Sequence, residues 1–193
     1  MPWSFKKEIQ RKILHLLASL AVIIIIIFVS MNFGKQIALL SLVFFLILLL
    51  ILEFWRLELK GKVPLVCSLF RDKEKDKLGG QIFLLIGGII AYAVFDYRIA
   101  LAAVLMTGFG DLVSSLVGKL GNIQITKERN FEGILAEFVV DLGIAFFLIN
   151  GWQIILIMAL TATFLETISN EIDDNFLIPI VAGFVAQAIS KVF

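Results

Sequence analysis

Long apolar blocks alternate with short polar segments along almost the whole chain. A helix needs about 20 mostly apolar residues to cross the hydrocarbon core of a bilayer, and each block approaches that length. The pattern therefore predicts an all-α integral membrane protein, a compact bundle of about seven transmembrane helices in a single domain of residues 1–193. The predicted spans are residues 14–31, 35–55, 79–95, 98–117, 133–150, 152–169 and 176–192.

The composition agrees with this class of protein. The chain is 60% hydrophobic and 17% charged, whereas soluble domains are about half apolar and a quarter charged. Basic residues precede the first block as in a signal peptide, but the block is too long and lacks a small-residue cleavage site, so we expect a retained span. The single cysteine, Cys67, has no partner for an intrachain disulfide, and a net charge of +1 gives no indication of nucleic-acid binding.

The positive charges lie on one side of the predicted bundle. If the spans alternate in direction, residues 1–13, 56–78 and 118–132 share a side and hold four, seven and three of the seventeen Lys and Arg residues. Positively charged loops stay in the cytoplasm. We therefore expect a cytoplasmic N-terminus in a multi-pass protein of the cell membrane. The polar, chemistry-bearing segments then face the cytoplasm.

The segment Gly110–Gly133 combines groups that rarely occur together at a membrane boundary. Asp111 closes the fourth predicted span, where a carboxylate costs about 2.5–3.5 kcal/mol on insertion scales. Glycines, hydroxyls and cations follow it, as a phosphate–Mg²⁺ site requires: Ser114, Gly118, Lys119, Gly121, Thr126, Lys127, Arg129 and then Glu132. The spacing does not fit a Walker A loop, because seven residues separate Gly110 from Gly118 and Leu120 follows Lys119.

Two further clusters lie at the predicted cytoplasmic ends of helices. Glu8, Arg11, Lys12 and His15 share one face of the first helix, although basic residues there also serve as topology signals. Glu53 and Arg56 lie three residues apart, the spacing of a helix-end salt bridge.

The third cluster is acidic. Glu166 lies inside the sixth predicted span, and Glu171, Asp173 and Asp174 follow it without a nearby Lys or Arg. Adjacent carboxylates suit a divalent metal, while the alternative is an acidic turn in which Asp174 or Asn175 caps the last helix. Glu137 and Asp141 lie on one face of the fifth predicted span, which predicts with Glu166 a polar cavity inside the bundle.

Four motifs in this order resemble the CTP-dependent lipid kinases: "RKILH", "GDLVSSLVGKLG", "KERNFEG" and "DDNFLIP". That family includes dolichol (polyprenol) kinases, phytol kinases and the yeast-type diacylglycerol kinase, and it is more distantly similar to phosphatidate cytidylyltransferases. The resemblance extends from Glu8 to Pro179, and the Gly-Asp block is its most specific part. The chain departs from the family before Glu132, where members often carry a further Lys and this sequence has Arg129, Asn130 and Phe131.

The resemblance implies transfer of the CTP γ-phosphate to the hydroxyl of a membrane lipid alcohol at the cytoplasmic interface, with Mg²⁺ as cofactor. The metal ligands it implies are Asp111, Asp173 and Asp174, and the other candidate catalytic residues are His15, Glu132 and Lys127. The implied nucleotide-binding residues are Arg11, Lys12, Ser114, Gly118, Lys119, Gly121, Arg129 and Asn175. Glu137, Asp141 and Glu166 would line the lipid cavity.

Several alternatives stay open at this point. The proton acceptor is His15, Glu132 or a bundle carboxylate such as Glu137, and either Lys127 or Arg129 meets the γ-phosphate. A cytidylyltransferase would attack the α-phosphate of CTP and make a CDP-lipid. A small proton- or cation-coupled transporter would use the buried carboxylates as its path. Neither the lipid nor the oligomeric state, a homodimer included, follows from the sequence.

Overall fold

The computed structural model describes residues 5–58, 77–126, 129–169 and 172–192. Every regular element within these ranges is a helix, which confirms the predicted all-α class. The predictions for Cys67, Lys127 and Glu171 lie outside the described residues, as does the side chain of Glu8.

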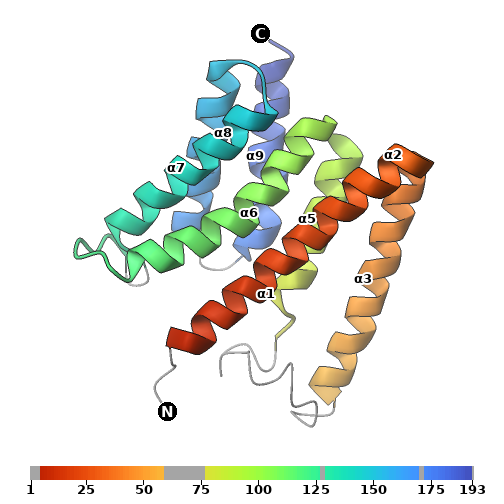
Figure 1. Ribbon diagram of the computed structural model, residues 1–193, viewed down its shortest axis with the longest axis horizontal. Coiled ribbons are helices and arrows are strands. Elements are labelled where there is room, and N and C mark those ends of the chain that lie inside the picture. The colour runs from red at the N-terminus through yellow and green to blue at the C-terminus, as the bar shows by residue number, and fades with distance from the viewer. Residues whose placement is uncertain (1–4, 59–76, 127–128, 170–171, 193) are drawn as a thin grey trace.

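The helices follow the apolar blocks of the sequence closely (Figure 1). The first block forms one continuous rod, made of α1 (Phe5–Ile24), a π-helical stretch η1 (Ile25–Val29) and α2 (Ser30–Phe33). The remaining blocks form α3 (Lys35–Glu58), α5 (Gly80–Val94), α6 (Tyr97–Gly118), α7 (Phe131–Leu148), α8 (Trp152–Ile168) and α9 (Asp174–Ser190).

Length and composition single out three of these helices as candidate membrane spans: Ile9–Phe33, Lys35–Glu58 and Tyr97–Gly118. Helices α5, α8 and α9 are apolar but shorter, and α7 carries three acidic residues within its 18 positions. That all seven rods cross a bilayer stays a prediction.

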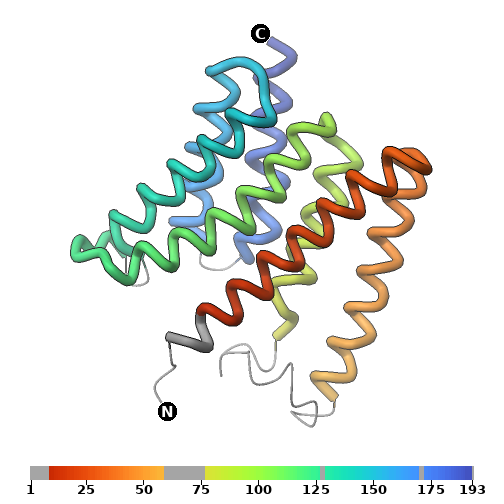
Figure 2. Tube along the Cα trace, in the orientation of Figure 1, coloured from red at the N-terminus to blue at the C-terminus, as the bar shows by residue number. Residues whose placement is uncertain are grey.

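Short turns on one side join neighbouring helices. Gly34 has φ of +90° between α2 and α3, and Gly151 has φ of +98° between α7 and α8. Glycine adopts this left-handed backbone without the steric penalty of a Cβ atom. From the turn at Gly34, α1 and α3 run antiparallel and diverge toward their other ends (Figure 2).

Helix α6 lies at the centre of the bundle and contacts α1, α5, α7, α8 and α9. Its inner face is built from small residues, which let neighbouring helices approach closely, as is usual for helices packed in membranes. Ala100, Ala102 and Ala103 are fully buried. Helix α3, by contrast, packs on η1, α2 and α5 and exposes large apolar residues such as Phe44 and Trp55.

The closest crossing joins α6 to α7. A Cβ atom at Gly133 would lie 2.7 Å from the carbonyl oxygen of Ser114 and 2.9 Å from Cα of Gly118. Both contacts are with backbone, so neither can be relieved by turning a side chain. The paired glycines therefore set the distance between the two helices that are joined by the polar loop.

We expect Gly133→Ala to destabilise the fold by about 1–3 kcal/mol, the usual effect of overpacking a tight contact. Gly143→Ala is a matched control on the same helix, because a Cβ atom there would meet nothing within 4 Å. Thermal unfolding in detergent micelles measures the difference. Equal unfolding temperatures for the two variants would contradict the close crossing.

Candidate active site

One end of the bundle gathers charged residues from segments that are far apart in the sequence. The start of α1, the end of α6, the start of α7, the end of α8 and the start of α9 all lie at this end (Figure 1). The apolar core, by contrast, occupies the middle and the far end of the bundle, for example Leu42, Leu84 and Ala186. This polar end is the candidate site.

Asp111 is surrounded by basic residues from the start of α1. Lys12 Nζ donates a hydrogen bond to its Oδ1 atom, and the two side chains are only 10% and 14% exposed. One turn deeper on α1, buried His15 lies close enough to interact electrostatically with Asp111 and Asp174. Arg11 is a further positively charged neighbour of Asp111. The structure therefore brings the basic face of α1 against the acidic end of α6.

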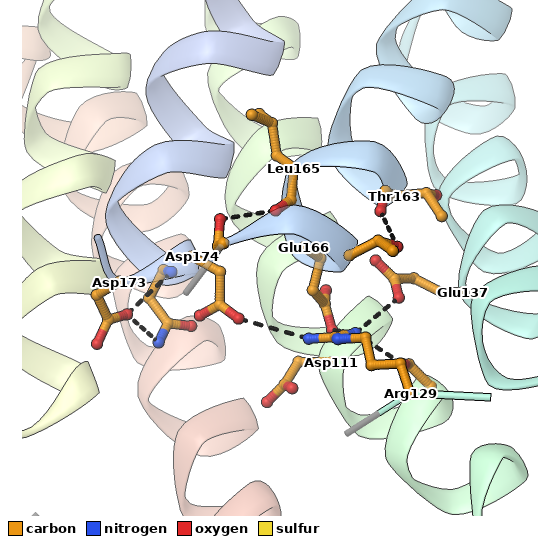
Figure 3. Close-up of polar contacts among 12 residues, drawn as sticks. Asp111, Arg129, Glu137, Thr163, Leu165, Glu166, Asp173 and Asp174 are labelled. Atoms are coloured by element: carbon orange, nitrogen blue, oxygen red, sulfur yellow. Dashed lines mark hydrogen bonds and ion pairs between the residues drawn. The ribbon is translucent and has the colours of Figure 1, made fainter. Parts of the chain in front are cut away.

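Asp174 lies on the other side of Asp111. The two carboxylates come from α9 and α6 and are close enough to act on one another electrostatically. Arg129 Nη2 lies 3.6 Å from Asp174 Oδ2 (Figure 3). Two carboxylates that repel one another are thus held together by cations, Lys12 on one side and Arg129 on the other.

This pair fits one kind of metal site. Within the described residues, no group of three or more His, Cys, Asp and Glu side chains is arranged to hold a metal ion. Mg²⁺ that accompanies a nucleotide needs less from the protein, because it binds one or two carboxylates and completes its shell with phosphate oxygens and water. Asp111 and Asp174 meet that requirement.

Arg129 points into the bundle. Its Nη1 atom donates to Glu166 Oε1 at 2.6 Å, Ser114 Oγ at 3.1 Å and Glu137 Oε2 at 3.3 Å (Figure 3). Burial by itself lowers the pKa of the guanidinium, but the Glu166 and Glu137 carboxylates outweigh it and raise that pKa above its ordinary value. Arg129 is therefore a fully charged cation whose Nη1 atom is already hydrogen-bonded within the bundle.

The three acids predicted to line a cavity lie close together inside the bundle, while the cavity itself stays a prediction. Glu137, Asp141 and Glu166 are at most 2% exposed, and Thr163 Oγ1 donates to Asp141 Oδ2 at 3.2 Å. Gly110 makes room for them, since a Cβ atom there would lie 3.1 Å from Asp141 Oδ1 and 3.3 Å from Glu137 Cγ. The glycine that precedes Asp111 thus accommodates the cluster, a function that the sequence alone did not suggest.

Comparison with known proteins identifies one relevant relative. The chain is 30% identical over 142 residues to CTP-dependent diacylglycerol kinase 1 from Eremothecium gossypii, an alignment that covers 70% of this chain and 44% of the relative. This similarity links the chain to the CTP-dependent lipid kinases, the family that its motifs resemble. It spans less than half the length of that curated relative. No family model matches the sequence, and no solved structure matches it.

Asp173 caps helix α9. Its Oδ1 atom accepts hydrogen bonds from the backbone N–H of Asn175 at 3.0 Å and from Asn175 Nδ2 at 2.6 Å. An aspartate at the N-cap satisfies amides that have no partner within the helix. Burial, with the charge of Asp174, raises the pKa of Asp173 to about 6. The prediction that Asp174 or Asn175 caps the helix is therefore wrong, because the cap is Asp173. Asp174 faces Asp111 and Arg129 instead.

The loop between α6 and α7 is held by its own polar residues. Glu132 Oε1 accepts from the backbone N–H groups of Asn122 at 2.9 Å and Ile123 at 3.3 Å. The Asn122 amide in particular lowers the pKa of the Glu132 carboxyl below its ordinary range. Asn130 Nδ2 donates to the carbonyl oxygens of Gly118 and Gly121 at 2.6 and 3.0 Å. These contacts give Glu132 and the two glycines a structural function in the loop.

The remaining predicted residues lie at the edge of this site. Ser114 is buried against Arg129, and Lys119 is exposed at the C-cap of α6.

The predicted salt bridge at the end of α3 is confirmed, since Arg56 Nε lies 2.7 Å from Glu53 Oε2. Glu53 also accepts from the backbone N–H of Gly79 at 2.6 Å, and this contact ties the end of α3 to the start of α5.

Proposed function

We propose that this chain is a CTP-dependent lipid kinase, a transferase that moves the γ-phosphate of CTP to the hydroxyl of a membrane lipid alcohol. The observation that carries the proposal is the similarity to a CTP-dependent diacylglycerol kinase, in a chain whose charged residues from α1, α6 and α9 meet around Asp111. Phosphoryl transfer depends mainly on positioning and on neutralising charge, which such a cluster supplies.

In this proposal Asp111 and Asp174 hold Mg²⁺ on the phosphates of CTP. The bound ion supplies neutralisation of the charge that develops on the transferred phosphoryl group. Lys12 and Arg11 approach Asp111 from α1. Lys119 lies at the end of α6, beside the loop that joins α6 to α7. These cations bind and orient the triphosphate.

His15 is the proposed acceptor of the lipid hydroxyl's proton. It is buried beside Asp111, and its Nε2 atom has no hydrogen-bond partner among the described residues. The other two candidates are less suited. The Glu132 carboxylate is bound by loop amides, and Glu137 is completely buried behind Arg129. A positioned imidazole contributes about 10²–10⁴-fold to such a proton transfer.

Diacylglycerol is the first candidate for the lipid, because the relative's name specifies it. Polyprenol, dolichol, phytol and geranylgeraniol present a similar primary alcohol on an apolar chain and are the other candidates. The reacting hydroxyl lies at headgroup depth, where the charged end of the bundle meets the apolar helix faces. In this proposal the charged end faces the cytoplasm, and the distribution of Lys and Arg along the sequence supports that orientation.

A matrix of donors and acceptors tests the proposal. Purified protein in mixed micelles is given CTP, ATP, GTP or UTP with Mg²⁺, each with diacylglycerol, polyprenol, phytol or geranylgeraniol. We expect a phosphorylated lipid with CTP, most of it from diacylglycerol, and none when Mg²⁺ is chelated. Absence of phosphorylated lipid in every combination would contradict the proposed function.

A further inference from the structure

Arg129 joins four helices through a single side chain. Its guanidinium contacts Ser114 on α6, Glu137 on α7, Glu166 on α8 and Asp174 on α9. The next residue, Asn130, is the N-cap of α7 and is bonded to the end of α6. Displacing Arg129 would therefore disturb both the start of α7 and the position of Asp174.

The acids that hold Arg129 are much more buried than Arg129 itself. The side chains of Glu137 and Glu166 are each 1% exposed, against 19% for Arg129. Carboxylates inside a helical bundle are unfavourable unless a cation or a proton balances them. To reach a phosphate, Arg129 would have to leave both glutamates without their cation. Such a movement would also break the ion pair between Arg129 and Asp174.

We propose that Arg129 is a positioning residue, anchored by Glu166 and Glu137, that holds Asp174 beside Asp111 and fixes the start of α7. The inference rests on the proposed function, in which Asp111 and Asp174 hold the metal–nucleotide. It assigns Arg129 to the protein's own framework and leaves binding of the phosphates to Lys12 and the other cations of the site. Glu166, at 2.6 Å, is the principal anchor.

Glu166→Gln and Arg129→Lys test this assignment kinetically. Glu166→Gln removes the anchoring charge, and Arg129→Lys keeps a positive charge but loses the planar fork that reaches Glu166 and Asp174 at once. In both variants we expect kcat to fall by at least about 10-fold while KM for CTP changes by less than about threefold. If Arg129 bound the nucleotide directly, KM for CTP would change while kcat stayed close to the wild-type value. Glu166→Gln would then release it toward CTP and leave kcat intact.

Limited trypsin digestion tests the anchor without reference to activity. Trypsin cuts after an arginine only when that side chain can enter the protease pocket, so an anchored Arg129 is protected. Cleavage after exposed Lys119 provides an internal reference. We expect the ratio of cleavage after Arg129 to cleavage after Lys119 to rise at least about 10-fold in Glu166→Gln, and less in Glu137→Gln, because protection follows the local opening equilibrium.

Glu53→Gln is the matched control, since it breaks another buried ion pair, the one between Glu53 and Arg56. It is expected to lower the unfolding temperature while leaving kcat and cleavage after Arg129 unchanged. Unchanged cleavage in Glu166→Gln would overturn the anchor, and increased cleavage with wild-type kcat would overturn the positioning function. A wild-type protein that phosphorylates no lipid would overturn the proposed function alone, because the digestion still decides whether the anchor exists.

Discussion

Replacing Asp111 by Asn is expected to reduce lipid phosphorylation on the order of 10³-fold, the effect of removing a preorganised electrostatic contact from an active site. Asn has the same shape, so the fold should survive. The change removes the carboxylate that pairs with Lys12 and lies beside Asp174. The initial rate of lipid phosphorylation at saturating CTP measures the loss, and circular dichroism verifies that the helices are retained.

Asp96→Asn provides the control for this variant. Asp96 precedes the opposite end of the same helix, and its Oδ2 atom accepts a hydrogen bond from Gln187 Nε2 at 2.9 Å. It lies at the turn before α6, far along that helix from Asp111. Its kinetic constants should equal those of the wild type. If Asp111→Asn kept a tenth or more of the activity, Asp111 would not be a metal ligand in the reaction.

Asp173 and Asp174 are neighbours in the sequence but should respond very differently to the same change. We expect Asp174→Asn to lower kcat/KM on the order of 10²-fold, because it removes a carboxylate that faces both Asp111 and Arg129. Asp173→Asn should retain most of the activity, since Asn caps a helix about as well as Asp. Steady-state kinetics of the two purified variants provide the comparison.

The reverse order, with Asp173→Asn the more damaging variant, would contradict the division of functions proposed for the two residues at the start of α9. Each variant is the control of the other, because both remove one charge at the same end of the same helix. A shared loss of stability would appear in the unfolding temperatures of both. A difference in rate at equal stability therefore reports on the chemistry alone.

The helices could be predicted from the sequence because a membrane-sized apolar block leaves few other choices. Backbone groups in lipid must bond within their own segment, so each such block becomes a helix. The first predicted span, residues 14–31, lies within the continuous rod from Phe5 to Phe33. The helix extends beyond the apolar block at its N-terminal end, where the polar residues of α1 continue it.

The contacts between helices could not be predicted in the same way. Lys12 and Asp111 are 99 residues apart, and nothing in either segment specifies that α1 packs on α6. The motifs indicated that both residues belong to one site without indicating that they pair. Side-chain partners depend on which helices are neighbours, and apolar blocks of similar composition do not encode their own order in space.

Arg129 shows the same limit at a single residue. The sequence indicates only that it is one of several cations near a phosphate site, and it predicts separately that Glu137 and Glu166 line a cavity. The folded chain places them in contact. Gly110 is a related case, because nothing in the sequence indicates that the space it leaves is filled by the acidic cluster. Packing between distant segments of the chain determines both the partners of Arg129 and the surroundings of Gly110.

The most direct test of the central claim follows the phosphorus atoms of CTP. The protein is incubated with a lipid alcohol or with the corresponding lipid phosphate, in each case with CTP labelled either at the γ-phosphate or at the α-phosphate, and the products are separated. The account predicts that γ-label appears on the lipid and that α-label leaves in CDP. Label from the α-phosphate on the lipid, with γ-label in pyrophosphate, would contradict it and identify a cytidylyltransferase.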